Sequence, residues 1–226
     1  MIAPLSSNPV KSRKNVYQSV TSHRLLREKM FLYLDKVLDS TQNIILITDT
    51  LNRVVETKLH ERFPFAQILR PEPGGYVVPD LIDSLLVDTL INKVVFESQN
   101  LGLIASVTSL LNSQVSEERD VQLFTTFRSN AYNNQNISKK QLGNLKFTYT
   151  AGEFPYNSPR SKVFDSLYVT VFGDLPQREA LRGYDVALDV ILRWSHINQL
   201  SSDNLGETEY IESRFDYVPN SAAGFE

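Results

Sequence analysis

Polar, charged and aromatic side chains follow three apolar runs of the sequence, at the point where each run ends. Short unbroken apolar runs are typical of buried strands in a parallel sheet, and the carboxyl ends of such strands form the edge where open α/β sheets bind ligands. Hydroxyls, carboxylates, amides, a ring and a guanidinium at that edge would suit a small zwitterion or a sugar–peptide fragment. The predicted ligand-binding residues are Thr48, Asp49 and Asn52 after the first run, Glu97, Ser98 and Asn100 after the second, and Thr126, Phe127 and Arg128 after the third.

Helix capping is the simpler explanation for several of these residues. Thr48, Asp49 and Ser98 each stand between a predicted strand and a predicted helix. Side-chain oxygens of Ser, Thr and Asp at that position accept hydrogen bonds from the free backbone N–H groups of the first helical turn. For Arg128, the alternative to a carboxylate-binding guanidinium is an exposed loop charge. The sequence alone leaves both interpretations open.

Catalytic and metal chemistry have little support in the sequence. The chain has no cysteine, which excludes disulfides, thiolate metal sites and a cysteine nucleophile. His23, His60 and His196 lie far apart, without the spacing of metal ligands. No phosphate-binding glycine loop and no Gly-x-Ser-x-Gly motif occurs, so Asp49 with Glu97 is the one acid pair that could serve catalysis. We therefore expect a protein that is not an enzyme, with no catalytic residue, no metal and no cofactor.

Length and composition indicate a globular protein. The chain of 226 residues is 42% hydrophobic, which is enough to fill a substantial core. Its net charge of -3 and pI near 5.7 give no broad basic surface, so we expect no nucleic-acid partner. No window reaches the roughly 18 apolar residues of a membrane helix. The first residues lack a charged segment followed by an apolar core, so we expect no membrane insertion and place any export signal upstream of Met1.

Strand and helix patterns alternate over most of the chain, which favours a parallel sheet with helices on both sides. We expect the α/β class: a three-layer α/β/α lobe with a mostly parallel central sheet of about five strands. The predicted strands are residues 43–49, 66–69, 93–97, 121–125 and 145–149, and the predicted helices are residues 22–39, 51–59, 81–86 and 103–111.

The last third of the chain predicts two helices and a strand. A helix begins at Pro159 and ends at Gly173, and a second helix follows with apolar residues at helical spacing. The alternating tail over residues 210–217 predicts an exposed strand, followed by a turn at residues 220–224, so we expect a short antiparallel strand pair there. The apolar face expected on the second helix consists of Leu181, Tyr184, Ala187, Leu188 and Ile191.

The corner between these two helices carries a family resemblance. The segment Phe172-Gly173-Asp174-Leu175-Pro176, followed by Arg182-Gly183-Tyr184-Asp185-Val186-Ala187, resembles a corner near the end of type I periplasmic binding proteins, the branched-chain amino acid receptor family. The order of the predicted elements is similar to the second lobe of such receptors. The resemblance implies that residues 1–19 are a connecting segment from a missing first lobe and that residues 20–226 form a single periplasmic-binding-protein type I-like lobe.

The same resemblance implies a function and a location. Such receptors close like a Venus flytrap on a small ligand, as in amino acid transport, by hinge motion of two lobes. The chain would then be a non-catalytic solute-binding lobe in the periplasm or cell envelope. Its partners would be an amino acid or a peptidoglycan fragment and the first lobe of the same protein. A LysM peptidoglycan-binding segment, as some such receptors carry, would lie outside this chain.

A second hypothesis is an envelope scaffold with the receptor fold and no small ligand. Receptors of this family that bind amino acids commonly place aromatic residues after the first two strands and an acid after the third. The residues in those neighbourhoods here are Leu51 or Asn52, Asn100, and Phe127 or Arg128. This difference disfavours amino acid binding, whereas Arg128 would suit a carboxylate.

Overall fold

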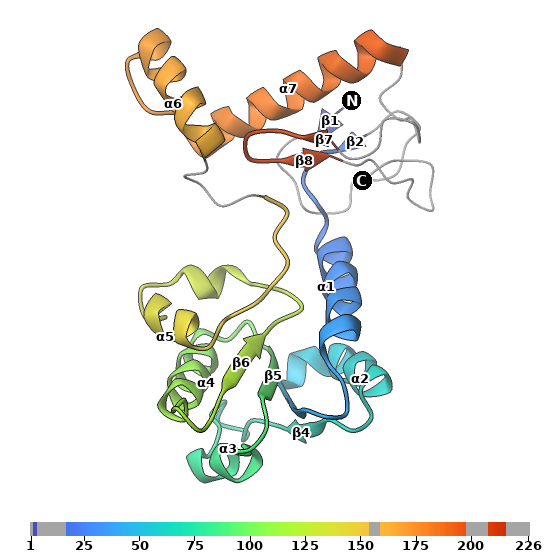
Figure 1. Ribbon diagram of the computed structural model, residues 1–226, viewed down its shortest axis with the longest axis vertical. Coiled ribbons are helices and arrows are strands. Elements are labelled where there is room, and N and C mark those ends of the chain that lie inside the picture. Colours follow the sequence, from blue (N-terminus) through green and yellow to red (C-terminus); the bar gives the residue numbers. More distant parts are fainter. Residues whose placement is uncertain (1, 4–16, 154–158, 198–207, 216–226) are drawn as a thin grey trace. The chain divides into compact units, whose positions relative to one another are not determined.

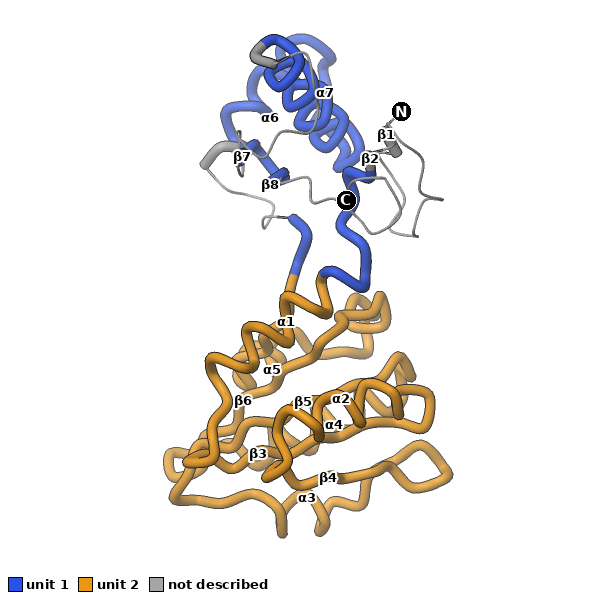
Figure 2. Tube along the Cα trace, turned by 90° about the vertical axis from the view of Figure 1, so that its right-hand side faces the viewer, with its two compact units in different colours: residues 1–25, 151–226 blue, residues 26–150 orange. Residues whose placement is uncertain are grey.

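The computed structural model describes residues 2–3, 17–153, 159–197 and 208–215 (Figure 1). The chain forms two compact units, coloured separately in Figure 2. Residues 26–150 are the sheet unit, and residues 1–25 with 151–226 are the helix unit. The single receptor-type lobe over residues 20–226 stays a prediction. The central sheet lies within residues 26–150, whereas the elements after residue 150 have an apolar cluster of their own.

Four parallel strands form the centre of the sheet unit, in the order β4-β3-β5-β6. Every residue of β3 and β5 is buried, as expected for strands covered on both faces. The strands are β3 (Asn43–Thr48), β4 (Gln67–Leu69), β5 (Asn92–Glu97) and β6 (Val121–Phe124).

Helices cover both faces of this sheet because successive strand residues point to opposite sides. Ile44 and Leu46 of β3 belong to the cluster formed with α1 and α2, and Ile45 and Ile47 belong to the cluster formed with α3 and α4. Each fully buried aliphatic side chain of this kind contributes roughly 1.5–3 kcal/mol. The predicted three-layer α/β/α architecture is confirmed. The helices are α1 (His23–Val37), α2 (Arg53–Arg62), α3 (Pro79–Leu85) and α4 (Leu101–Ser113).

The fifth predicted strand, residues 145–149, is reduced to a single parallel bridge between Phe124 and Thr148. The preceding helix α5 (Lys139–Asn144) ends in a left-handed turn, with Lys146 at φ 49°. The N–H of Lys146 donates to the Gly143 carbonyl and the N–H of Phe147 to the Leu142 carbonyl, the pattern of a Schellman motif. This turn interrupts the extended backbone that a strand requires.

One further expectation in the sheet unit needs correction. The predicted helix over residues 51–59 begins as the 3₁₀ turn η1 (Thr50–Asn52), and Leu51 and Val54 are 89% and 72% exposed rather than packed. The polar stretch after Arg128 is ordered around a second 3₁₀ turn, η2 (Asn130–Asn133), whose Tyr132 is 1% exposed.

An asparagine pair organises the amino edge of the sheet. The Asn43 Nδ2 donates to Asn92 Oδ1 at 2.8 Å, and the Asn92 amide also bonds the backbone of Val87 and the carbonyl of Asp120. Asn92 is fully buried, and its satisfied amide links the loops that enter β5 and β6.

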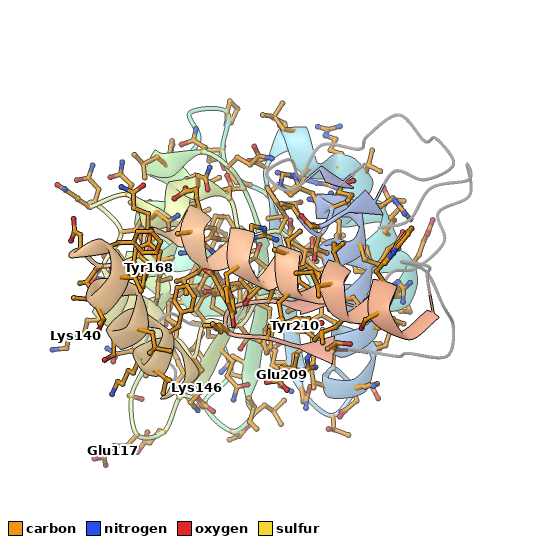
Figure 3. The ribbon with its side chains drawn as sticks, turned by 90° about the horizontal axis from the view of Figure 1, so that it is seen from above. Glu117, Lys140, Lys146, Tyr168, Glu209 and Tyr210 are labelled. Atoms are coloured by element: carbon orange, nitrogen blue, oxygen red, sulfur yellow. The ribbon has the colours of Figure 1, made fainter. Side chains whose placement is uncertain are left out.

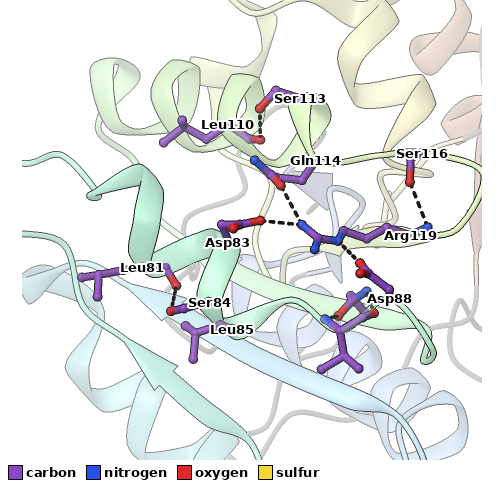
Figure 4. Close-up of polar contacts among 12 residues, drawn as sticks. Leu81, Asp83, Ser84, Leu85, Asp88, Leu110, Ser113, Gln114, Ser116 and Arg119 are labelled. Atoms are coloured by element: carbon purple, nitrogen blue, oxygen red, sulfur yellow. Dashed lines mark hydrogen bonds and ion pairs between the residues drawn. The ribbon is translucent and has the colours of Figure 1, made fainter.

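Arg119 makes a second link at the same edge (Figure 4). Its guanidinium donates to Asp83 Oδ1 at 2.6 Å, to Asp88 and to Gln114 Oε1 at 2.7 Å. These hydrogen bonds connect the end of α3 with the loop between α4 and β6. The two carboxylates are more than half exposed, so the stabilisation is modest.

Two long helices dominate the helix unit, α6 (Pro159–Phe172) and α7 (Arg178–Ile197), in agreement with the sequence prediction. The Phe164 and Tyr184 rings, 4.8 Å apart, join the two helices, and Tyr168, labelled in Figure 3, lies against Phe172 at 4.4 Å. Gly173 ends α6 at φ 79°, where a side chain would be strained.

The predicted tail strand over residues 210–217 is instead a hairpin within the described residues. Strand β7 (Thr208–Glu209) pairs antiparallel with β8 (Arg214–Phe215), and residues 210–213 form the turn. The predicted antiparallel pair exists, but it lies upstream of the turn expected at residues 220–224, which is outside the described residues. A parallel pair, β1 (Ile2–Ala3) with β2 (Tyr17–Gln18), falls in the segment predicted as a connection, most of which lies outside the described residues.

The buried face of α7 agrees with the prediction only in part: Leu181 is fully buried as expected, but charged residues are buried beside it. Tyr184 and Ile191 of the expected apolar face are 44% and 63% exposed. Asp185 and Asp189 are fully buried instead, and Arg193 is 3% exposed. The spacing of four residues puts these three side chains in one stripe along the helix.

The C-terminal hairpin supplies hydrogen-bond donors to the two aspartates of this stripe. Asp185 accepts hydrogen bonds from the backbone N–H groups of Ile211, Glu212 and Ser213, at 3.1, 2.8 and 2.9 Å. Asp189 accepts from the Tyr210 hydroxyl and from Arg193 Nε, at 2.9 and 2.8 Å. The Gly-Tyr-Asp motif therefore has a structural role here, because its aspartate caps the hairpin turn.

Among the described residues, none of the helices combines the length and hydrophobicity needed to cross a bilayer.

Candidate functional site

From β3 the chain adds β4 on one side and then β5 on the other side, so the strand order reverses between β3 and β5. A crevice for ligands is expected outside the carboxyl ends of these two strands. The structure brings three predicted residues together there: Ser98 Oγ donates to Asp49 Oδ2 at 2.7 Å, and Asn52 Nδ2 donates to Asp49 Oδ1 at 2.8 Å. The polar groups of these side chains thus bond one another at this edge.

Capping accounts for the same residues. Asp49 is the N-cap of η1 and accepts from the Leu51 N–H at 3.0 Å. Asn100 is the N-cap of α4 and accepts from the Leu103 N–H at 3.1 Å, and Ser98 Oγ accepts from the Asn100 N–H. The capping interpretation is confirmed for Asp49, and Asn100 is a cap that the sequence had assigned to the ligand.

The hydroxyl of Thr48 is hydrogen-bonded to α2, away from the expected ligand. Its side chain, 1% exposed, donates to Glu56 of α2. Arg70 forms an ion pair with Glu56 at 2.5 Å, and its hydrogen bond is the main reason that the pKa of the Glu56 carboxyl lies below its ordinary value. Thr48 anchors this pair within the protein.

Glu97 ties β5 to β6 and faces inward. Its carboxylate, 2% exposed, accepts hydrogen bonds from the Thr126 N–H and from Thr125 Oγ1. Burial raises the pKa of Glu97. The hydrogen bonds from Thr126 and, to a lesser extent, the guanidinium of Arg27 at 3.9 Å partly offset that rise. Glu97 and Thr126 thus hold the backbone that follows β6 in place, and both side chains are buried.

Phe127 and Arg128 are half-exposed next to the end of β6. Asp49 and Asn52 are half-exposed as well, and Asn100 is exposed. Arg27 donates from Nε to Thr126 Oγ1 at 3.1 Å, and its guanidinium lies 5.7 Å from the centre of the Phe127 ring. Arg128 lies 4.9 Å from the centre of the Tyr149 ring. Two guanidinium–ring pairs at this edge form a cationic surface with planar apolar faces.

Arg27 and Tyr149 were missed by sequence reasoning. Arg27 lies on α1, 99 residues from its hydrogen-bond partner Thr126, so no local spacing connects them. Tyr149 stood at the end of a predicted strand, which gave no sign of its pairing with Arg128. Within the described residues, no group of His, Asp and Glu is arranged to hold a metal ion.

No protein-family model and no curated protein matches the sequence. Two solved structures resemble the chain. One is a leucine-binding protein, LivK, from Thermotoga maritima, at 14% identity and a TM-score of 0.40, covering 89% of this chain and 58% of that one. The other is an extracellular ligand-binding receptor from Desulfohalobium retbaense, at 13% identity and a TM-score of 0.39, covering 99% of this chain and 39% of that one.

Both of these proteins are named for binding rather than for catalysis. The chain spans 58% of the length of the first and 39% of the second. At these identities and TM-scores, the likeness assigns neither a ligand nor a mechanism to the present chain.

Proposed function

We propose that the chain is part of a non-catalytic solute receptor of the cell envelope, in which the carboxyl edge of the sheet captures a small carboxylate-bearing ligand by hinge closure. An amino acid or a peptidoglycan fragment is the expected ligand class. The first lobe of the same receptor would supply the remaining contacts, and a LysM segment elsewhere in the protein could hold it at peptidoglycan.

The observation that carries this proposal is the pair of half-exposed arginines, Arg27 and Arg128, at the end of β6. Each guanidinium lies against a ring and offers planar donors that match a carboxylate. The buried hydrogen bonds of Glu97 to β6 fix the backbone from which Phe127 and Arg128 project. Such a supported cationic edge favours a ligand with an anionic group.

The scaffold hypothesis also has a specific observation in its favour. Asp49, Asn52 and Ser98 bond one another at the β3–β5 crevice, where an open α/β sheet would normally receive its ligand. A receptor fold that had lost its ligand would show this internal closure.

Calorimetric titration of the complete native protein separates the two hypotheses. L-leucine, L-glutamate and muramyl dipeptide are suitable probes, since each has a carboxylate. The test variant is Arg128→Gln. The matched control is Arg62→Gln, which removes a cation from α2 whose partner Asp35 lies on the exposed surface.

The receptor hypothesis predicts that at least one probe binds and that Arg128→Gln weakens it by about tenfold, which corresponds to about 1.4 kcal/mol. Arg62→Gln should leave the affinity unchanged. Binding that is insensitive to Arg128→Gln would contradict the proposed site, and absence of binding for all three probes would favour the scaffold. Glu97→Ala is unsuitable as a test, because it leaves a buried N–H without a partner.

A further inference from the structure

A pocket of about 310 Å³ lies on the sheet unit, between the end of β6 and α5. Its volume is at the lower end of the range for small-molecule sites. Arg128, Lys139 and Lys146 contribute charge to it, and Leu142, Phe147 and Tyr149 contribute apolar surface. None of these residues except Arg128 belongs to the predicted ligand-binding set.

The pocket carries an excess of positive charge. Lys146 forms an ion pair with Asp120 at 2.8 Å, which lowers the pKa of that aspartate. Lys139 is exposed and forms no ion pair with any residue that the structure describes. Arg128 donates to the neutral amide of Asn133. Three cations and one carboxylate leave a site that attracts an anion.

A stacked column of rings forms the apolar wall. Phe147 stacks on Tyr132 with ring centres 4.8 Å apart and an interplanar angle of 21°, and Tyr149 lies 5.2 Å from Phe147. Tyr132 is buried in the core of the sheet unit, so it holds the column in place. Leu142 extends this wall from α5. The wall would pack against a planar apolar group.

Lys146 occupies a backbone position that favours glycine. Its φ of 49° places it in the left-handed region at the end of α5, where helices commonly end in glycine. A lysine at this position adds a cation to the pocket at a conformational cost.

We propose that this pocket binds a small anion that carries an aromatic ring, with the anionic group among Arg128, Lys139 and Lys146 and the ring against Phe147 and Tyr149. The site lies beyond the sheet-edge site proposed above and shares Arg128 and Tyr149 with it. Phenyl phosphate and benzoate are the probes, since they combine a ring with a phosphate or a carboxylate. Inorganic phosphate and phenol each provide one of the two features.

The test measures binding of each probe to the chain by NMR chemical-shift titration. Lys139→Gln removes a cation of the pocket that forms no ion pair with the described residues. Its control, Lys140→Gln, makes the same charge change one residue away, at a side chain that does not line the pocket. Lys140 and Lys146 are labelled in Figure 3, where Lys140 reaches outward at the rim of the view.

We expect phenyl phosphate or benzoate to bind in the millimolar range or tighter, and to bind more tightly than inorganic phosphate or phenol. Lys139→Gln should weaken binding by about fivefold and Lys140→Gln by less than about twofold. The better anion of the two identifies the phosphate or carboxylate class. Three results would each overturn the proposal: chemical-shift changes confined to lysines outside the pocket, equal losses of affinity in the two variants, or no binding.

A further variant separates this site from the sheet-edge site. Phe127 does not line the pocket, so Phe127→Ala should leave binding of phenyl phosphate or benzoate unchanged. If Phe127→Ala abolishes binding of these probes while Lys139→Gln does not, the ligand binds at the sheet edge and the pocket is not a site. Failure of one proposal therefore does not imply failure of the other.

Discussion

The two units of the chain differ in the side chains that dominate their interiors. The sheet unit packs aliphatic residues such as Leu46 and Val94 into clusters on both faces of the sheet. The helix unit has a small apolar cluster, formed by Val186, Tyr210 and Phe215, beside the buried charges of α7. It leaves many large apolar side chains exposed: Val163, Leu167, Val171, Phe172, Leu175, Ile191 and Trp194 are each more than half exposed.

This difference shows that two kinds of interaction stabilise one chain. Apolar packing is non-directional and tolerates substitutions that conserve volume. A buried carboxylate with several donors is stable only while its partners are in place, because the unpaired charge is costly. We therefore expect the sheet unit to respond to lost volume and the helix unit to respond to lost partners.

The largest expected effect comes from lost volume in the sheet unit. Leu46 is fully buried at the centre of β3, so Leu46→Ala should lower the free energy of unfolding by about 3–5 kcal/mol. Hydrogen exchange measured by mass spectrometry should show the loss of protection in residues 26–150. Leu46→Ile, which conserves volume, is the control and should cost less than about 1.5 kcal/mol. Equal losses in the two variants would contradict a volume-based account.

A slightly smaller effect is expected from a lost partner in the helix unit. Asp185→Ala removes the acceptor for the N–H groups of Ile211, Glu212 and Ser213, and should cost about 3 kcal/mol. Urea unfolding followed by fluorescence of Trp194, the one tryptophan of the chain, reports on this unit.

Glu179→Ala is the matched control for Asp185→Ala. It removes an exposed carboxylate from the same helix and should cost less than about 1 kcal/mol. If the two variants unfold at the same urea concentration, the hairpin cap does not stabilise the helix unit, and the comparison between the units loses its main support.

Titration of two glutamates in the sheet unit should give effects of opposite sign. Burial raises the folded-state pKa of Glu97 above 4.5, so its contribution to stability is present at low pH and is lost as the pH rises through that higher value. Arg70 lowers the pKa of Glu56 below 4.5, so its contribution is present at higher pH and is lost as the pH falls through that lower value.

Thermal unfolding between about pH 3 and pH 8 tests these signs. Relative to the wild type, Glu97→Gln should gain stability toward neutral pH, and Glu56→Gln should lose it. Parallel pH profiles for the two variants would show that the environments of the two carboxyls do not differ as the structure indicates.

The smallest expected effect is a gain in stability from Lys146→Gly. Lys146→Gly relieves the left-handed backbone at φ 49° and loses an exposed ion pair with Asp120. The first change is worth roughly 1 kcal/mol and the second less, so the free energy of unfolding should stay unchanged or rise by up to about 1 kcal/mol. Chemical unfolding of the sheet unit measures this free energy. Lys140→Gly is the control, because a glycine inside α5 should destabilise the helix.

The strands and helices of the sheet unit were largely predictable because the sequence patterns that indicate them are local. The unbroken apolar runs at β3 and β5 and the helical spacing of Leu103, Val107 and Leu111 each require only neighbouring residues. The strand ends also located the edge that contains Phe127 and Arg128. Whether the side chains at the edge face a ligand or bond one another depends on residues far along the chain, as Ser98 and Asp49 illustrate.

The buried face of α7 was not predictable from periodicity. Tyr184 and Ile191 satisfied the apolar spacing, yet Asp185 and Asp189 are buried because the hairpin supplies their donors more than 20 residues later. A pattern based on hydrophobicity assigns acids to the solvent. Such a pattern does not include hydrogen-bond partners that come close only in the folded chain.

The hairpin cap on Asp185 also bears on the order in which the chain is made. Synthesis proceeds from the N-terminus at about 5–20 residues per second, so every residue of the sheet unit is available once residue 150 has been added. The helix unit combines the first 25 residues with the segment after residue 150, and α7 emerges before the N–H groups that Asp185 requires. For on the order of several seconds Asp185 lacks the backbone donors of the hairpin, although Asp189 and Arg193 can pair within α7. This unit is therefore the last part of the described chain to complete its fold.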